Sequence, residues 1–183
     1  DLSPEAQLIG AVNTVLNDNG KLIGYNTDGY GFMQSVRDAG HDITGKNITV
    51  MGVGGASMAI CAQSALDGAA SVHIFARRTS RYWNRTQKFA ENLSAKTGCQ
   101  VCLFDNDDHT ALRDSIAQSY LLINATSVGM VPDIDDTIIK DTSLFHPELV
   151  VADVVYEPQE TRLLREAKAA GCQTFNGMYM LLH

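Results

Sequence analysis

The chain has 183 residues, of which 45% are hydrophobic and 19% are charged, with a formal net charge of −7. This length fits one domain or one domain with part of another, and the composition is typical of a soluble protein with a packed core. The acidic balance argues against nucleic-acid binding. No stretch approaches the ~20 apolar residues of a membrane span, and the first residues do not resemble a signal peptide, so we expect a cytoplasmic protein without membrane contact.

The N-terminal part of the chain predicts a β-hairpin followed by a helix. We expect strands over 11–16 and 21–25, joined by a hairpin-type turn at 17–20, and then a helix over 28–39. The hairpin stands outside the alternating pattern that follows it, so we interpret residues 1–27 as the remnant of a second domain. The chain has no initiating Met and stops within an apolar helical pattern, which indicates a piece of a longer protein.

From residue 48 onward, strand and helix signals alternate along the chain. This alternation predicts an α/β fold with a doubly wound, Rossmann-type parallel sheet and helices on both faces. The acidic run 105–108 is placed to cap the helix after it. The expected strands lie near 48–52, 71–75, 100–104, 120–124, 149–155 and 172–175, and the expected helices near 56–67, 83–96, 108–117 and 161–170.

The four cysteines do not form a metal or redox site in this pattern. Cys99 and Cys102 have the spacing of such a pair, but they fall in a predicted strand, where residues three apart point to opposite faces. No second pair of cysteine or histidine residues completes a zinc site in the sequence. We therefore expect reduced, structural cysteines and no bound metal.

An apolar strand breaks into a glycine-rich turn that reads Gly52-x-Gly54-Gly55-Ala56-Ser57. Gly52 allows a tight turn, and Gly54 and Gly55 lack side chains, so backbone N–H groups can approach a pyrophosphate. A helix opening at Ala56 or Ser57 would direct its positive dipole end at the phosphates. Ser57 takes the place of the third glycine in the usual dinucleotide fingerprint and is small enough for close helix–strand packing. A tight turn without a ligand is the alternative.

The next predicted strand after the glycine-rich turn, near 71–75, is followed by basic residues. In an NAD enzyme, an Asp or Glu near the end of this strand binds the ribose 2′-hydroxyl. No Asp or Glu lies between Asp67 and Glu91. Cations and hydroxyl donors suit a 2′-phosphate, so the sequence favours NADP(H) over NAD(H) and makes 28–183 an NADP-binding domain. Solvated arginines without a ligand are the alternative. The cluster consists of Arg77, Arg78, Arg81 and Arg85, with Thr79 at the same corner.

Two further segments are rich in polar residues. The first, 24–29, lies between a predicted strand and a predicted helix, and the second, 124–130, follows the fourth strand of the alternating series. Ligands in open α/β sheets bind beyond the carboxyl ends of the strands, which is where 124–130 is expected. An ordinary loop is the alternative for this segment, and helix capping is the alternative role of Asp28.

Together these motifs resemble the shikimate/quinate dehydrogenase family. The matching segments follow the family's order and extend over nearly the whole chain. The resemblance implies reversible oxidation of shikimate to 3-dehydroshikimate with NADP, a step of chorismate and aromatic amino-acid biosynthesis, and some members also use quinate and NAD. The segments are IGAVNT (9–14), GYNTDG (24–29), GVGGAS (52–57), NATSVGM (124–130), DVVYEP (153–158) and GMYML (177–181).

The resemblance also implies roles for individual residues. Asp28 would be the carboxylate of a catalytic Lys/Asp pair and would contact the substrate. Asn13 would hydrogen-bond the substrate, and Tyr156 would lie at the substrate or nicotinamide edge. A proton leaves the hydroxyl as hydride leaves the carbon, so such a site needs an acid–base group within reach. The implied cofactor-binding residues are Gly52, Val53, Gly54, Gly55, Ala56, Ala76, Arg77, Arg78, Thr79, Thr126, Ser127, Val154, Val155, Tyr156, Gly177 and Met180.

Three features depart from the family pattern. The family's catalytic lysine belongs to an upstream motif that the chain lacks, and neither Lys21 nor Lys46 lies in that motif. A substrate-contacting Gln of the family would come directly after His183. At the 2′-phosphate corner, Ala76 replaces the usual Asn, and Thr79 stands where NAD-tolerant members carry Asp.

We therefore expect the chain to bind NADP(H), with NAD as the second choice, and to turn over little substrate by itself. The alternatives are a quinate/shikimate enzyme of dual cofactor use, a non-catalytic nucleotide-sensing module, and a Rossmann domain for S-adenosylmethionine. The arginine cluster argues against the last, because that ligand has no phosphate. The sequence leaves open whether shikimate or quinate is preferred, and whether the protein forms a homodimer.

Overall fold

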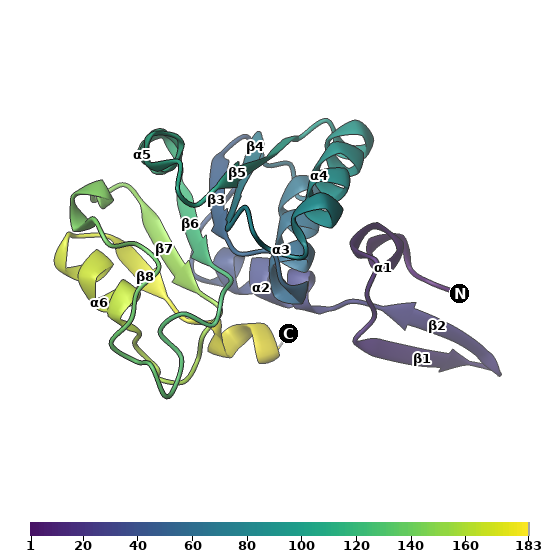
Figure 1. Cartoon of the computed structure of the whole chain (residues 1–183). Helices are drawn as coiled ribbons and strands as arrows, with labels where there is room; N and C mark the ends of the chain where they lie inside the picture. The colour runs from purple at the N-terminus through teal and green to yellow at the C-terminus, as the bar shows by residue number, and fades with distance from the viewer. Residues whose placement is uncertain (183) are drawn as a thin grey trace.

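A computed structural model describes residues 1–182 and contains a six-stranded sheet beside a two-stranded hairpin (Figure 1). The strand order in the large sheet is β5-β4-β3-β6-β7-β8, and its pairings are all parallel. This is the order of a doubly wound dinucleotide-binding sheet, so the predicted Rossmann-type fold is confirmed. The strands are β3 (Asn47–Met51), β4 (Ser71–Ala76), β5 (Gln100–Asp105), β6 (Leu121–Asn124), β7 (Val150–Asp153) and β8 (Gln173–Phe175).

Helices cover both faces of the sheet (Figure 1). One core contains Phe32, Ile60 and Leu93 from three helices on the first face, and the other contains Ile116 and Leu164 from two helices on the second. Within residues 1–182, no helix has both the length and the apolar character needed to cross a membrane. The helices of the sheet domain are α2 (Asp28–Asp38), α3 (Gly55–Leu66), α4 (Trp83–Thr97), α5 (His109–Gln118) and α6 (Arg162–Ala169), with a short 3₁₀ turn η1 (Thr142–Leu144).

The central strands are buried on both sides of the sheet. Every residue of β6 and β7 is buried, as expected for parallel strands that helices cover on both faces. The last residues of these strands, Asn124 and Asp153, are polar and also buried, so they require partners within the protein. Both lie at the carboxyl edge of the sheet, which is the edge that binds ligands in this fold.

The hairpin pairs β1 (Thr14–Asp18) with β2 (Lys21–Tyr25) in antiparallel register. Its turn holds Asn19 and Gly20 at φ of 51° and 92°, as a two-residue type I′ turn requires. The prediction that the first strand begins at residue 11 is wrong, because pairing starts at Thr14. The preceding residues instead turn toward the start of α2.

A short helix beside the hairpin is absent from the sequence prediction, and the apolar helical pattern at the end of the chain forms a short 3₁₀ segment. Helix α1 (Pro4–Ile9) is capped by Ser3, whose hydroxyl accepts a hydrogen bond from the N–H of Ala6, and α1 lies against α3 and α4. The 3₁₀ segment η2 (Gly177–Leu181) packs against α2. The division of the chain at residue 27 stays a prediction.

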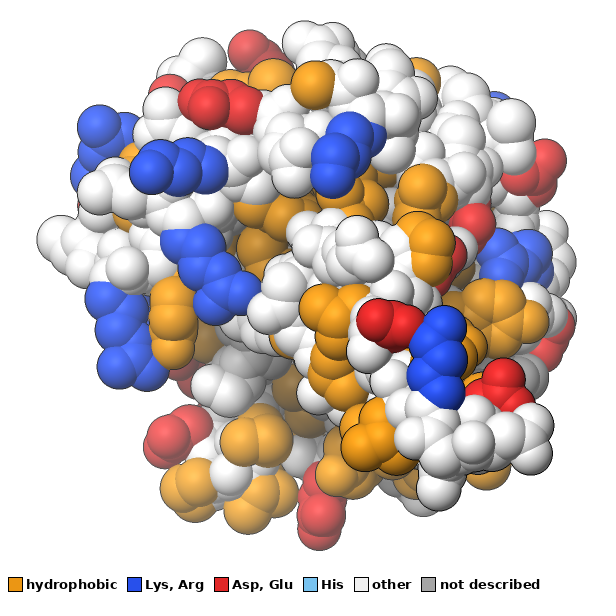
Figure 2. All heavy atoms as spheres, turned by 90° about the vertical axis from the view of Figure 1, so that its right-hand side faces the viewer, with side chains coloured by type: hydrophobic (Ala, Val, Ile, Leu, Met, Phe, Trp, Pro, Cys, Tyr) orange, Lys and Arg blue, Asp and Glu red, His pale blue; other side chains and the backbone are white. Residues whose placement is uncertain are grey.

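The hairpin leaves apolar side chains open to solvent. Figure 2 shows the molecule from the hairpin's side, with hydrophobic side chains gathered among scattered charges. The exposed fractions of Val15, Leu16 and Leu22 are 62%, 50% and 59%. A strand pair of this kind gains little stability from its own burial, so its order depends on the backbone pairing and on α1 beside it.

Candidate functional site

The carboxyl ends of β3 and β6 lie side by side at the centre of the sheet, where the strand order reverses. Two large hollows open at this switch point. The main cleft, of about 780 Å³, is lined by Gly52, Val53, Gly54, Phe75, Ala76, Arg77, Thr79, Ser80, Arg81, Tyr82, Asn106, Ala125, Thr126, Ser127, Val128 and Ile138. The side pocket, of about 410 Å³, shares Gly54 and 125–127 with it and is otherwise lined by Gly55, Ala56, Met130, Val131, Val154, Val155, Tyr156 and Glu157.

Gly52 makes the tight turn that the sequence predicts at the end of β3. Its φ is 113°, and a Cβ there would lie 2.7 Å from the carbonyl oxygen of Ala125. Only glycine fits this combination of left-handed backbone and close approach between two strands. Ser57 closes the turn, because its buried hydroxyl donates a 2.6 Å hydrogen bond to the carbonyl of Gly52. The residue in the third-glycine position therefore contributes a bond as well as a small volume.

Helix α3 begins at Gly55, one residue before the predicted start, and Gly54 is its N-cap residue. No side chain caps this end of the helix, so its first N–H groups remain available to a ligand. A Cβ built on Gly54 or Gly55 meets nothing within 4 Å, and both residues line the side pocket. These positions offer open space and amide donors at a positive helix end, which fits the pyrophosphate of a dinucleotide.

The basic corner lies where the sequence places it, but its arginines are used differently. Arg77 and Arg81 line the main cleft, together with Thr79 and Ser80. The guanidinium of Arg78 lies 4.6 Å from the ring centre of Trp83, and this residue does not line the cleft. The described lining residues of the cleft include no Asp or Glu. The corner therefore suits an anion such as a 2′-phosphate, with Arg81 in the position predicted for Arg78.

Arg81 is held over its neighbour in the sequence. Its guanidinium lies 4.7 Å from the ring centre of Tyr82 and donates a 2.6 Å hydrogen bond to the Tyr82 hydroxyl. A planar cation stacked on an aromatic ring retains free N–H groups for a phosphate. The sequence pattern identifies this arginine as part of the cluster but not as a cleft residue.

Asn124 and Asp153 form a buried polar pair behind the side pocket, and the sequence patterns did not identify it. The side-chain amide of Asn124 donates to Asp153 at 3.0 Å and to the carbonyl of Val128 at 3.1 Å. Its carbonyl oxygen accepts from the N–H and the hydroxyl of Thr126. This one amide therefore organises 124–128, which borders both hollows. The sequence signal for this pair is that Asn124 and Asp153 are each a polar residue at the end of an otherwise apolar strand.

Asp153 accepts three hydrogen bonds and is fully buried. The donors are the side-chain amide of Asn124 at 3.0 Å, the N–H of Val155 at 2.9 Å and the hydroxyl of Thr161 at 2.7 Å. Burial raises the pKa of this carboxyl group to about 6, against the opposing effect of these hydrogen bonds. Thr161 is in turn the N-cap residue of α6, so the carboxylate joins two loops and a helix start.

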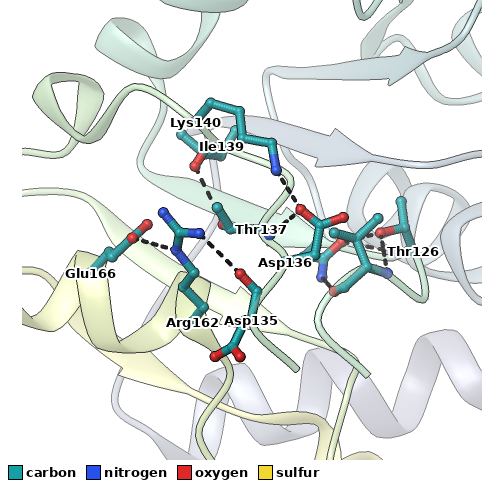
Figure 3. A network of polar contacts seen from close by, with 10 residues as sticks. Thr126, Asp135, Asp136, Thr137, Ile139, Lys140, Arg162 and Glu166 are labelled. Atoms are coloured by element: carbon teal, nitrogen blue, oxygen red, sulfur yellow. Dashed lines mark hydrogen bonds and ion pairs between the residues drawn. The ribbon is translucent and has the colours of Figure 1, made fainter. Parts of the chain in front are cut away.

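A loop over 131–141 borders the cleft and is fastened to α6 (Figure 3). The guanidinium of Arg162 donates to the carbonyl of Asp135 at 2.9 Å and to Glu166 at 2.7 Å. Within the loop, Lys140 pairs with Asp136. These contacts fix the segment that carries Ile138 into the main cleft.

Asn13 and Asp28 lie together at the junction of the hairpin and α2. The Asn13 side-chain amide donates to Asp28 Oδ1 at 2.7 Å, and its carbonyl oxygen accepts from the N–H of Thr27 at 3.0 Å. The N-cap residue of α2 is Thr27, so the alternative role of Asp28 as a helix cap is not what the structure shows. A Cβ on Gly29 would overlap the backbone of Ala59, so this end of α2 presses against α3.

Of four other predicted residues, Tyr156 and Val154 line the side pocket, whereas Gly177 and Met180 do not. Tyr156 is 46% exposed at its rim, and Val154 passes so close to Gly177 that a Cβ on the glycine would overlap the Val154 carbonyl. Met180 packs against the core on the α2 side of the sheet and does not line either hollow. The structure thus brings most of the predicted cofactor-binding residues together around the two hollows. The predicted site residues that line neither hollow are Arg78, Gly177, Met180, Asn13 and Asp28.

The cysteines and acidic residues give no sign of a metal centre in the described part of the chain. No group of three His, Cys, Asp or Glu side chains in residues 1–182 could hold an ion. The cysteines are free, and burial raises the pKa of Cys61 to about 12 and that of Cys99 to about 11. The prediction that Cys99 and Cys102 share a strand is wrong, because β5 begins at Gln100.

No protein-family model matches the chain. The chain is 50% identical over 181 residues to the shikimate dehydrogenase (NADP(+)) of Listeria innocua serovar 6a, which covers 99% of the chain and 62% of that relative. It is 42% identical over 182 residues to the quinate/shikimate dehydrogenase of Escherichia coli O139:H28, which covers 100% of the chain and 63% of the relative. The chain belongs to the shikimate/quinate dehydrogenase family.

A solved member of the shikimate/quinate dehydrogenase family has the same fold. This is the shikimate 5-dehydrogenase of Listeria monocytogenes, crystallised with shikimate and NAD. It matches with a TM-score of 0.96 and 49% identity, covering 99% of the present chain and 62% of the solved one. The chain spans 62 to 63% of the length of the two curated relatives described above. The resemblance inferred from the sequence motifs is confirmed as family membership.

Proposed function

We propose that the chain is the NADP-binding part of a shikimate dehydrogenase, which transfers hydride reversibly between shikimate and 3-dehydroshikimate. The main cleft carries this proposal, because a free helix N-terminus, two glycines facing open space and two arginines meet at one switch point. The Listeria relatives add support, since they are named shikimate dehydrogenases and one was crystallised with shikimate. The proposed ligands are thus small molecules, with no part for nucleic acid.

The residues around the two hollows fit a dinucleotide. Gly54 and Gly55 would hold the pyrophosphate, Arg77 and Arg81 the 2′-phosphate, and the side pocket the nicotinamide end, with Tyr156 at its rim. When bound, NADP supplies the acceptor for the hydride that leaves the carbinol carbon. The apolar walls of the side pocket would exclude water from that reaction.

The acid–base part of the proposal rests on Asp28. Asn13 engages only Oδ1 of this carboxylate in the structure, so Oδ2 can accept a hydrogen bond from a substrate hydroxyl. A carboxylate held in one orientation can position that hydroxyl and share its proton as oxidation proceeds. In the family this role is divided with a lysine from a motif that the chain does not contain.

Cofactor choice can be tested with the three neighbouring arginines. We expect calorimetric titration to show tighter binding of NADP⁺ than of NAD⁺, and Arg77→Ala or Arg81→Ala to remove most of this preference. Arg78→Ala is the matched control, because it deletes the same charge from a side chain that stacks on Trp83 outside the cleft. Equal loss in all three variants would mean that only the general positive field matters, and no preference in the unchanged chain would refute NADP specificity.

The catalytic role needs a separate test in the protein that contains this chain and its substrate-binding part. Asp28→Asn should lower kcat for shikimate oxidation by roughly 100-fold, the scale of a lost acid–base group, with the Kd of NADP⁺ unchanged. An unchanged kcat would favour a non-catalytic, nucleotide-sensing module. A parallel fall in cofactor affinity would point to misfolding at the start of α2.

A quinate/shikimate dehydrogenase that uses NAD as well as NADP is the second candidate. The 42% identity to the Escherichia coli quinate/shikimate enzyme and the NAD in the Listeria monocytogenes crystal favour it. Ala76, which replaces the usual Asn at the ribose corner, is also a departure from the NADP pattern, whereas Thr79 stands where NAD-tolerant members carry Asp and so favours NADP. Comparable Kd values for the two cofactors would support this candidate. A cytoplasmic location and a homodimer stay predictions from the sequence.

A further inference from the structure

The wall of the side pocket formed by 154–157 is fixed from behind by one buried carboxylate. Asp153 Oδ1 accepts from the N–H of Val155 at 2.9 Å, two residues further along the same segment. The same oxygen accepts from Asn124, and Oδ2 accepts from Thr161. Asp153 itself has no exposed surface and lines neither hollow. Its only route to a ligand is through the segments that it holds.

We propose that Asp153 is a positioning residue that sets the nicotinamide side of the site, while the adenosine side depends on other contacts. This inference rests on the proposed cofactor function. The segment 154–157 lines the side pocket and not the main cleft, whereas the arginine corner lines only the main cleft. A change at Asp153 should therefore weaken one end of the dinucleotide selectively.

Asn124 differs from Asp153 in which segment it controls. Its own hydrogen bonds to Thr126 and Val128 hold 124–128, which borders both hollows. These bonds do not pass through Asp153, so they survive its truncation. Removing the Asn124 amide should loosen both ends of the site, whereas removing the Asp153 carboxylate should loosen only one.

The hydrogen-bond geometry makes Asp153→Asn a conservative variant. An asparagine can keep its carbonyl oxygen toward Val155 and Asn124, where both partners donate. Its amide group then faces Thr161, whose hydroxyl can turn from donor to acceptor. Asp153→Ala deletes all three bonds. Comparing Asp153→Ala with Asp153→Asn therefore separates the effect of losing the hydrogen bonds from the effect of losing the negative charge.

The experiment compares two ligands on the same set of variants. NADPH binding is followed by nicotinamide fluorescence, and adenosine 2′,5′-bisphosphate, which lacks the nicotinamide half, is titrated calorimetrically. Thr49→Val serves as a control for destabilisation, because Thr49 is fully buried and bonds the hydroxyls of Ser115 and Ser119 away from both hollows. Thermal unfolding of each variant is measured alongside.

We expect Asp153→Ala to raise the Kd of NADPH about tenfold and that of the bisphosphate by less than about twofold, since only one wall loses its preorganisation. Asp153→Asn should bind both ligands with Kd values near those of the unchanged chain. Asn124→Ala should weaken the binding of both ligands, and Thr49→Val should weaken neither.

Equal weakening of the binding of both ligands by Asp153→Ala, or no change in either Kd, would overturn the inference. If Asp153→Ala fails to fold, Thr161→Val, which deletes one of the three bonds together with the N-cap bond to Leu164, must give the same selectivity in smaller degree. Failure of the unchanged chain to bind either ligand would instead refute the proposed cofactor function.

Discussion

Alanine substitution of two glycines in the turn after β3, Gly52 and Gly54, should have different effects on the free energy of unfolding. Gly54 has an ordinary extended backbone, with φ of −82° and ψ of −176°, and a Cβ there meets nothing within 4 Å. Gly54→Ala should therefore leave the fold intact, with a change in unfolding free energy of less than about 1 kcal/mol. At Gly52, a φ of 113° and a Cβ 2.7 Å from the Ala125 carbonyl oxygen predict a loss of about 2 to 4 kcal/mol.

Gly54→Ala, the variant expected to keep its stability, should lose more affinity for the cofactor than Gly52→Ala. The methyl group of Gly54→Ala would occupy the space through which the first amides of α3 reach a pyrophosphate. Hydrogen bonds to charged groups contribute roughly 1.5 to 3 kcal/mol each, so losing one or two should weaken binding by about 3 kcal/mol, or about 100-fold in Kd. Gly54→Ala should thus remain stable while it loses most of its affinity for NADP⁺.

Chemical denaturation and calorimetric titration of the two variants would check this pair of effects. Gly52→Ala can be titrated at low temperature, where enough of it remains folded to measure a Kd. If Gly54→Ala binds NADP⁺ as tightly as the unchanged chain does, the open space at Gly54 has no role in binding and this prediction is wrong. It also fails if Gly54→Ala is the less stable of the two variants.

Three further changes test the structure around the site. Ser57→Ala removes a buried hydrogen bond to the Gly52 carbonyl and should cost about 1 to 2 kcal/mol of unfolding free energy by urea denaturation. Gly29→Ala forces a methyl group onto the backbone of Ala59 and should cost about 1 to 3 kcal/mol, and unchanged stability would show that α2 can move away from α3. The pKa of Asp153 is raised from its ordinary 3.8 to about 6, so the native state binds the extra proton, and stability relative to Asp153→Asn should fall by up to about 3 kcal/mol as pH rises from about 4 to about 7. A pH-independent difference between these two proteins in denaturation curves would contradict the raised pKa.

Local sequence patterns were sufficient for the sheet and for the glycine turn. The alternation of apolar runs and helical segments determines which face each element buries, and it placed all six parallel strands to within a few residues. The hairpin start failed because 11–13 are as apolar and β-branched as the strand that follows. What ends the pairing at Thr14 is a tertiary contact, in which the Asn13 side chain bonds Thr27 and Asp28.

The walls of the cleft could be predicted only in part. Which of the adjacent residues Arg77 and Arg78 lines the cleft depends on the turn after β4 and on the position of Trp83, and a local pattern contains neither. The Asn124–Asp153 pair requires knowing that β6 and β7 are neighbours, although the two residues are 29 positions apart. Each residue lies in a segment that the sequence singles out, 124–130 or 153–158, but no local pattern pairs the two residues with each other.

The contact between α2 and α3 has a mechanical consequence for the two residues at the hairpin junction. Gly29 lets the start of α2 lie directly against α3, so Asp28 is tied to the sheet domain. Asn13, by contrast, directly precedes β1 and must follow the hairpin. Their 2.7 Å hydrogen bond therefore joins the hairpin to the sheet domain, so the orientation of the Asp28 carboxylate depends on both parts of the chain.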